Sequence, residues 1–135
     1  MEQNNKEIIK EVLDEIEASI KDPRGLVAHQ RRLAFLLSLG IIALIENYLS
    51  KFDILKPRAK INHPWYKKQR DNVKDLISNQ ITCPVNNIKN IEEILDIAFD
   101  IEKERNKLAY GKLVSENVLK EKINLFFTLK KKIEK

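Results

Sequence analysis

The stretch "LAFLLSLGIIALI", residues 33–45, decides the fold of this chain. Its thirteen residues carry no charge, and at helical spacing they place apolar side chains on every side. A helix that is apolar all round is enclosed by other elements, and a bilayer span takes about 20 residues. The stretch therefore predicts the central helix of a bundle. Because glycine inside a helix costs about 1 kcal/mol relative to alanine, Gly40 predicts the close approach of a neighbouring helix.

Outward from this helix, apolar side chains recur at helical spacing over nearly the whole chain. Breaks are expected at Asp22-Pro23, at "TCPVNN" (82–87) and at Gly111, a candidate C-cap. Asn90 and Glu93 have the spacing of a capping box at a helix start. The sequence predicts a single all-α domain over residues 1–135, an up-and-down bundle of about five helices. The expected helices cover about 4–21, 24–52, 64–80, 90–110 and 115–134.

Chain length, cysteine content and the N-terminal sequence predict a single-domain cytoplasmic protein without an internal disulfide. The 135 residues suit one domain, and the single cysteine, Cys83, excludes an internal disulfide. The polar, acidic first 21 residues are unlike an export signal, so we expect a cytoplasmic protein without a membrane segment. His29 is expected on the surface of the second helix. Because His29, His63 and Cys83 lie far apart in sequence, no metal site and no cofactor are predicted.

Charge is distributed unevenly along the chain, whose net charge is +5. Residues 1–22 hold three bases and seven acids, which gives −4, and residues 90–111 hold three bases and six acids, which gives −3. Residues 23–89 hold twelve bases and four acids, +8, and residues 112–135 hold seven bases and three acids, +4. A focused basic excess is compatible with a polyanion partner, and the alternative is a set of solvated Lys-rich faces.

The densest basic segment is "KPRAKINHPWYKKQR", residues 56–70, which contains no acid. Lys and Arg neutralise phosphates and aromatic rings stack on unpaired bases, a combination suited to single-stranded RNA. The alternative is a solvated loop whose tryptophan packs into the bundle. His63 is either a turn residue before Pro64 or a replacement base over a cleft. The candidate RNA-binding residues are Lys56, Arg58, Lys60, Trp65, Lys67, Lys68 and Arg70.

A polar break interrupts the apolar stripe of the fourth expected helix. On a helical wheel Arg105 falls near the middle of the apolar face, and Glu102 lies about 60° from it. Because an unpaired charge in a core is costly, two arrangements remain open. Either Arg105 pairs with Glu102, or the bundle opens into a polar cleft where the guanidinium binds a phosphate. Asn47 and Glu46 of the second helix are candidate cleft residues, and the alternative for Asn47 is a fraying helix end.

The stretch "ERNKLAYG", residues 104–111, after a long apolar helix resembles the HEPN superfamily of small all-α bundles. The resemblance covers about residues 25–130. It implies a dimeric bundle and, in many members, a metal-independent ribonuclease. The family signature is Arg, often followed by Asn, then His at the fifth position after the Arg. Arg105 and Asn106 match the first two, and Tyr110 stands where the family has His.

The tyrosine leaves three functions open. A histidine with a pKa of about 6.5 transfers protons at neutral pH, whereas a tyrosine with a pKa of about 10 mostly does not. We therefore favour a non-cleaving, RNA-binding homodimer over a metal-independent endoribonuclease toxin using Arg105, Asn106, Tyr110 and Glu102. The third interpretation, also implied by the resemblance, is a protein-interaction module of a toxin–antitoxin pair, partnered with a nucleotidyltransferase. A bundle in which Arg105 is only structural is the alternative to all three.

Overall fold

The computed structural model describes residues 2–51, 77–79, 81, 88 and 90–134. Within this part of the chain every regular element is helical, so the predicted all-α class is confirmed. Most of the helix expected at 64–80, and all of the basic segment 56–70 with Cys83, lie outside the described residues. The elements are α1 (Glu2–Lys21), the 3₁₀ helix η1 (Leu26–His29), α2 (Gln30–Lys51), α4 (Ile91–Glu102), α5 (Arg105–Tyr110) and α6 (Glu116–Glu134).

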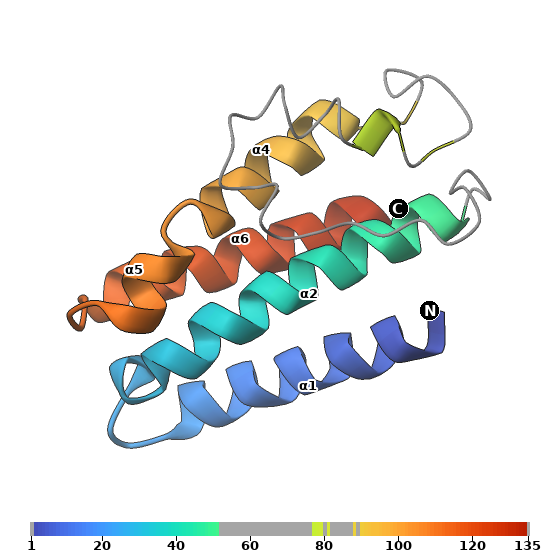
Figure 1. Cartoon of the computed structure of the whole chain (residues 1–135). Coiled ribbons are helices and arrows are strands. Elements are labelled where there is room, and N and C mark those ends of the chain that lie inside the picture. Colours follow the sequence, from blue (N-terminus) through green and yellow to red (C-terminus); the bar gives the residue numbers. More distant parts are fainter. Residues whose placement is uncertain (1, 52–76, 80, 82–87, 89, 135) are drawn as a thin grey trace.

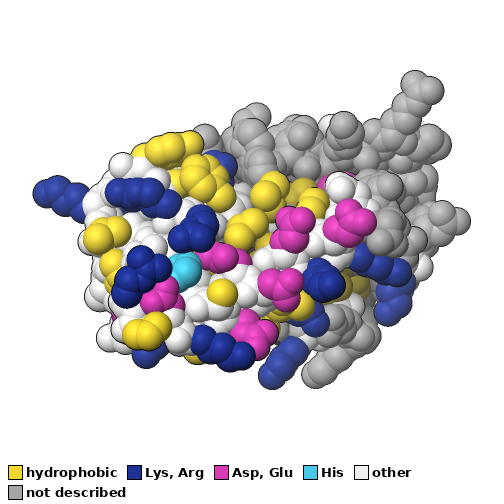
Figure 2. Space-filling view, turned by 90° about the horizontal axis from the view of Figure 1, so that it is seen from below, with side chains coloured by type: hydrophobic (Ala, Val, Ile, Leu, Met, Phe, Trp, Pro, Cys, Tyr) yellow, Lys and Arg dark blue, Asp and Glu magenta, His cyan; other side chains and the backbone are white. Residues whose placement is uncertain are grey.

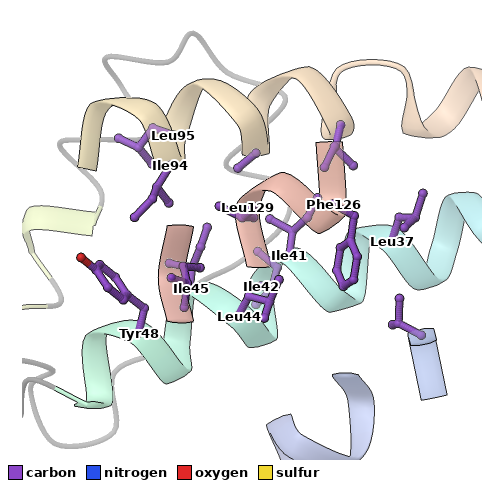
Figure 3. Packing of buried hydrophobic residues seen from close by; sticks show 14 of the residues in the cluster. Leu37, Ile41, Ile42, Leu44, Ile45, Tyr48, Ile94, Leu95, Phe126 and Leu129 are labelled. Carbon is purple, nitrogen blue, oxygen red and sulfur yellow. The ribbon is translucent and has the colours of Figure 1, made fainter. Parts of the chain in front are cut away.

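Helix α2 is the centre of the bundle, as its sequence predicts. Helices α1, α4, α5 and α6 all pack against it (Figure 1). Its Ile41, Ile45 and Leu49 are almost fully buried, and Figure 3 shows Ile41 and Ile45 among side chains from α4 and α6. By length and composition the segment Leu26–Lys51 could cross a membrane, but most of it is buried by the other helices, as in a core helix.

Gly40 lies where two helices approach α2 from different directions. A Cβ atom at this position would lie 2.7 Å from Phe126 Cε2 of α6 and 3.1 Å from Val12 Cγ2 of α1. Both neighbours are completely buried. The predicted close approach at Gly40 is confirmed, and a glycine is what permits it.

We expect Gly40→Val to lower the free energy of unfolding by about 3 kcal/mol, because the branched side chain must displace a buried ring and a buried methyl group. Urea denaturation measures the change. The control is Leu39→Val, which introduces the same side chain one position earlier, at a partly exposed site. Equal destabilisation by the two variants would show that the β-branched residue, and not the packing at Gly40, is responsible.

The corner between α1 and α2 is held by polar contacts and turns His29 inward. The backbone N–H of Arg24 donates to Asp22 Oδ1 at 2.8 Å, and Leu26 N–H donates to Glu116 Oε1 of α6, also at 2.8 Å. His29 ends the 3₁₀ helix and is buried. Its expected position on the surface is therefore wrong, because the tighter 3₁₀ turn changes the side that His29 faces.

Asp22 gives this corner a dependence on pH. The Arg24 guanidinium donates to both carboxylate oxygens and lowers the pKa of Asp22 well below its usual range, and the Arg24 backbone N–H and His29 act in the same direction. A lowered native pKa means that Asp22 stabilises the fold above its unfolded-state pKa of about 4. This stabilisation is lost as the pH falls.

We therefore expect Asp22→Asn to lower Tm at neutral pH, and the deficit to shrink between about pH 5 and pH 2. Thermal unfolding followed by circular dichroism across that range measures it. Asp14→Asn, at an exposed position of α1, is the control and should leave Tm nearly unchanged throughout. A constant deficit at every pH would contradict the electrostatic explanation.

The single helix expected at 90–110 is wrong, since α4 ends at Glu102 and α5 begins at Arg105. Buried Lys122 of α6 lies at the break, where its Nζ donates to the Asp100 carbonyl at 2.8 Å. In an uninterrupted helix that carbonyl accepts from the N–H of residue 104. A buried ammonium group needs hydrogen-bond acceptors. The Asp100 carbonyl supplies one to Lys122 at the point where α4 ends.

The cap predicted at the start of this expected helix is wrong, whereas the cap predicted at its end is confirmed. Asn90 occupies the N-cap position with φ 63°, and its side chain makes no capping hydrogen bond. Glu93 instead contacts Lys132 Nζ of α6 at 2.6 Å, so the predicted capping box is wrong. Gly111 is the C-cap of α5, as predicted, and its N–H donates to the Lys107 carbonyl at 2.8 Å.

Candidate functional site

Arg105 opens the short helix α5 and lies against α2. Its Cζ atom is 5.2 Å from the centroid of the Phe35 ring, within the range of a cation–π contact. One terminal nitrogen donates to Asn106 Oδ1 at 3.1 Å. Among the described residues its buried Nε has no hydrogen-bond partner. No ion pair between Arg105 and Glu102 is formed there, because the break after Glu102 turns Arg105 towards Phe35.

Tyr110 contacts the same ring. Its ring packs edge-on against Phe35 with centroids 5.7 Å apart, yet 73% of the residue is exposed. Phe35 therefore links the two residues predicted to act together. We call Arg105, Asn106, Phe35 and Tyr110 the Arg105 cluster. A guanidinium and an exposed phenol on one aromatic support can bind a phosphate and offer a stacking face to a base.

Further basic residues lie near the Arg105 cluster in sequence or in contact with the end of α5. Arg31 of α2 donates to the Gly111 carbonyl at 3.2 Å, which places it beside the end of α5. Lys107 and Lys112 are exposed on α5 and just after it. Within the described part of the chain no carboxylate forms an ion pair with Arg31, Arg105, Lys107 or Lys112. Their positive charge is therefore available to an anion.

Gln30 holds this region in place. It is almost completely buried at the start of α2, and its Nε2 donates to the carbonyls of Leu108 at 3.0 Å and Lys112 at 3.1 Å. Its Oε1 accepts from Val114 N–H at 2.9 Å. One side chain thus satisfies three backbone groups of α5 and the segment that follows it. Nothing in the local sequence marked Gln30 or Phe35, because both act through contacts with residues 70 or more positions away.

The other predicted site residues do not join the Arg105 cluster. Asn47 lies twelve residues beyond Phe35 on α2, which is about 18 Å along a helix, and it faces a hollow between α1 and α6. Glu46 is buried at the same end of α2, and Glu102 is buried at the end of α4. Within one chain Asn47 and Arg105 therefore do not share a cleft, and a cleft completed by a second copy stays a prediction. The seven RNA-binding candidates between Lys56 and Arg70, with His63, lie outside the described residues.

Metal ligands do not cluster in the described ranges, which contain no group of three or more His, Cys, Asp or Glu side chains able to hold an ion. Comparison with protein-family models, curated proteins and solved structures finds no match for this chain.

Proposed function

We propose that this chain is a HEPN-like RNA-binding protein whose contact surface includes the Arg105 cluster. One observation carries the proposal: a guanidinium supported by Phe35 and bonded to Asn106 has no carboxylate partner among the described residues. Structural arginines within bundles ordinarily pair with carboxylates. An arginine held rigidly with its charge unpaired is suited to receive an anion.

The surroundings of Arg105 favour RNA over a small anion. Lys107 on α5, Lys112 just after it and Arg31 at its end add further positive charges to that of Arg105. Tyr110 exposes most of its ring beside this charge. Charge that follows a backbone, next to an aromatic face, is the usual combination for single-stranded nucleic acid.

Within this proposal the protein binds RNA without cleaving it. Tyr110 occupies the position of the histidine that moves protons in the ribonucleases the chain resembles, and a phenol is a poor proton acceptor at neutral pH. Among the described residues, the only histidine, His29, is buried at the α1–α2 corner and not in the Arg105 cluster. Homodimer formation and pairing with a nucleotidyltransferase remain predictions of the resemblance.

The test is binding and cleavage of a fluorescent single-stranded RNA pool in EDTA, with Arg105→Ala beside the unaltered chain. We expect at least tenfold weaker binding in the variant, since a charge-assisted contact contributes about 1.5–3 kcal/mol. Lys131→Ala, which removes one exposed charge from the far end of α6, is the control for net charge and should bind nearly as well as the unaltered chain.

Three outcomes distinguish the interpretations. Binding lost in Arg105→Ala but kept in Lys131→Ala supports recognition at the Arg105 cluster. Cleavage that leaves 2′,3′-cyclic phosphate ends and disappears in Arg105→Ala would replace the binding function by the endoribonuclease. Equal binding by all three proteins would contradict the proposal.

A further inference from the structure

A long groove between α1 and α6 is separate from the Arg105 cluster. Both helices pack on α2 and come close to each other at few positions (Figure 1). Three hollows of about 400, 310 and 380 Å³ follow one another along the gap. Leu13 lines the first two and Ile20 lines the last two, so neighbouring hollows adjoin each other. We call this feature the α1–α6 groove.

The α1–α6 groove is apolar inside. Ile9, Leu13 and Ile20 line it from α1, and Ile123, Phe127 and Ile133 line it from α6. Ile20 is 62% exposed and Phe127 is 37% exposed, although both are large hydrophobic residues. Exposed apolar side chains gathered in one concave place are typical of a binding surface, whereas isolated ones are not.

The charge left on the rim of the groove is positive. Lys6 and Lys10 lie at one end and Lys120 at the other, all three are exposed, and none forms an ion pair with a described residue. The acids of the rim are already engaged. Glu17 pairs with Lys21 at 2.6 Å, and Glu116 accepts the backbone N–H of Leu26. A partner that fills the groove therefore meets lysines on its flanks.

We propose that the α1–α6 groove docks an acidic amphipathic helix of a partner protein. From Ile9 to Ile20 the groove extends for about 16 Å, or three helical turns. A helix with apolar residues spaced three and four apart places one anchor in each hollow. Carboxylates beside those anchors face the rim lysines, which supplies orientation and raises the association rate.

The shape and charge of the groove disfavour two other occupants. A second copy of the chain, placed groove to groove, would bring the rim lysines of one copy against rim lysines of the other. A lipid surface is flat, whereas the hollows are recessed between two helices. Figure 2, which views the bundle from the α1 side, also shows Asp and Glu interspersed with Lys and Arg, an arrangement unsuited to a broad anionic membrane.

The experiment uses a designed fluorescent peptide of about 15 residues, with leucines spaced three and four apart and glutamates elsewhere. Fluorescence anisotropy at low salt measures its affinity for the full chain. We expect saturable binding that weakens at least tenfold in Ile20→Asp. The matched control is Leu113→Asp, because Leu113 is 63% exposed, as Ile20 is, but lies outside the groove. Thermal unfolding verifies that both variants stay folded.

Two further peptides make the test decisive. One has lysine in place of glutamate and the other has the same composition with scrambled leucines, and neither should bind. Absent binding of the glutamate peptide, equal binding of the lysine peptide, or indifference to Ile20→Asp would overturn the proposal. A self-association or an anionic-vesicle affinity that Ile20→Asp abolishes would assign the groove to a second copy or to lipid instead. RNA binding at Arg105 does not enter this test, so either proposal can fail alone.

Discussion

Gln30→Leu is expected to lower the free energy of unfolding by about 4 kcal/mol, the largest effect predicted for a single substitution here. Leucine fills a similar volume but can bond neither the Leu108 and Lys112 carbonyls nor the Val114 N–H. These backbone groups meet Gln30 at 2.9 to 3.1 Å in a largely buried place. A buried polar group left without a partner costs about 1–3 kcal/mol, and three such groups would be left at once.

Urea denaturation measures this change, and two further variants separate its causes. Arg31→Ala removes a single exposed contact to the Gly111 carbonyl in the same region, and it should cost less than about 0.5 kcal/mol. Gln30→Glu keeps the acceptor for Val114 N–H but sets a buried carboxylate oxygen against the Leu108 and Lys112 carbonyls, so its loss should be as large as that of Gln30→Leu at neutral pH. If Gln30→Leu were no worse than Arg31→Ala, water would be replacing the three hydrogen bonds, and the inferred anchoring role would be wrong.

Gln30→Leu also bears on function. Because Gln30 fixes the end of α5, its loss should disturb the position of Arg105 relative to Phe35, and RNA affinity should fall even where the variant is still folded. Arg105→Ala should weaken binding with little change in stability, since the residue is only partly buried and forms no ion pair with a described residue. The two variants together distinguish a residue that positions the cluster from one that contacts RNA.

What could be predicted from the sequence depends on how local the deciding contacts are. A helix over residues 33–45 is apolar on every side, and in a small domain such a helix must be surrounded by the others. The stretch therefore predicted the central helix and the close approach at Gly40. One short helix carries Arg105, Asn106 and Tyr110, so their closeness in space could be predicted from their spacing in the sequence. The break between α4 and α5 could not be foreseen, because it coincides with the contact of Lys122 with Asp100, 22 residues away in the chain.

The same distinction explains the errors at the site. The wheel that placed Arg105 beside Glu102 assumed one unbroken helix, and a turn of two residues was enough to redirect the guanidinium towards Phe35. Asn47 was expected near Arg105 because it lies on the side of α2 that was predicted to face the fourth helix. The two residues are far apart because Arg105 contacts α2 at Phe35, twelve residues before Asn47. Phe35 and Gln30 were missed because each looks ordinary in its own segment and acquires its role only when α5 packs on α2.

His29→Leu is expected to lower the free energy of unfolding by about 3 kcal/mol, as removal of one partner from a buried polar pair does. The two ring nitrogens of His29 lie 2.9 Å from Glu15 Oε1 and 2.8 Å from Asp22 Oδ2. Those carboxylate side chains are only 17% and 15% exposed. Without the ring, Glu15 and Asp22 lose the polar group between them and face each other across the corner between α1 and α2, with exposed Arg32 and Arg24 as their remaining partners.

A double-mutant cycle decides whether this explanation is right. Glu15→Gln in the His29→Leu background removes one of the two facing charges and should restore part of the stability, although Glu15→Gln alone should be destabilising. Ala28→Leu, at the exposed neighbouring position, is the control and should have little effect. If the two substitutions were simply additive, the carboxylates would be solvated without the ring, and His29 would stabilise the corner by packing alone.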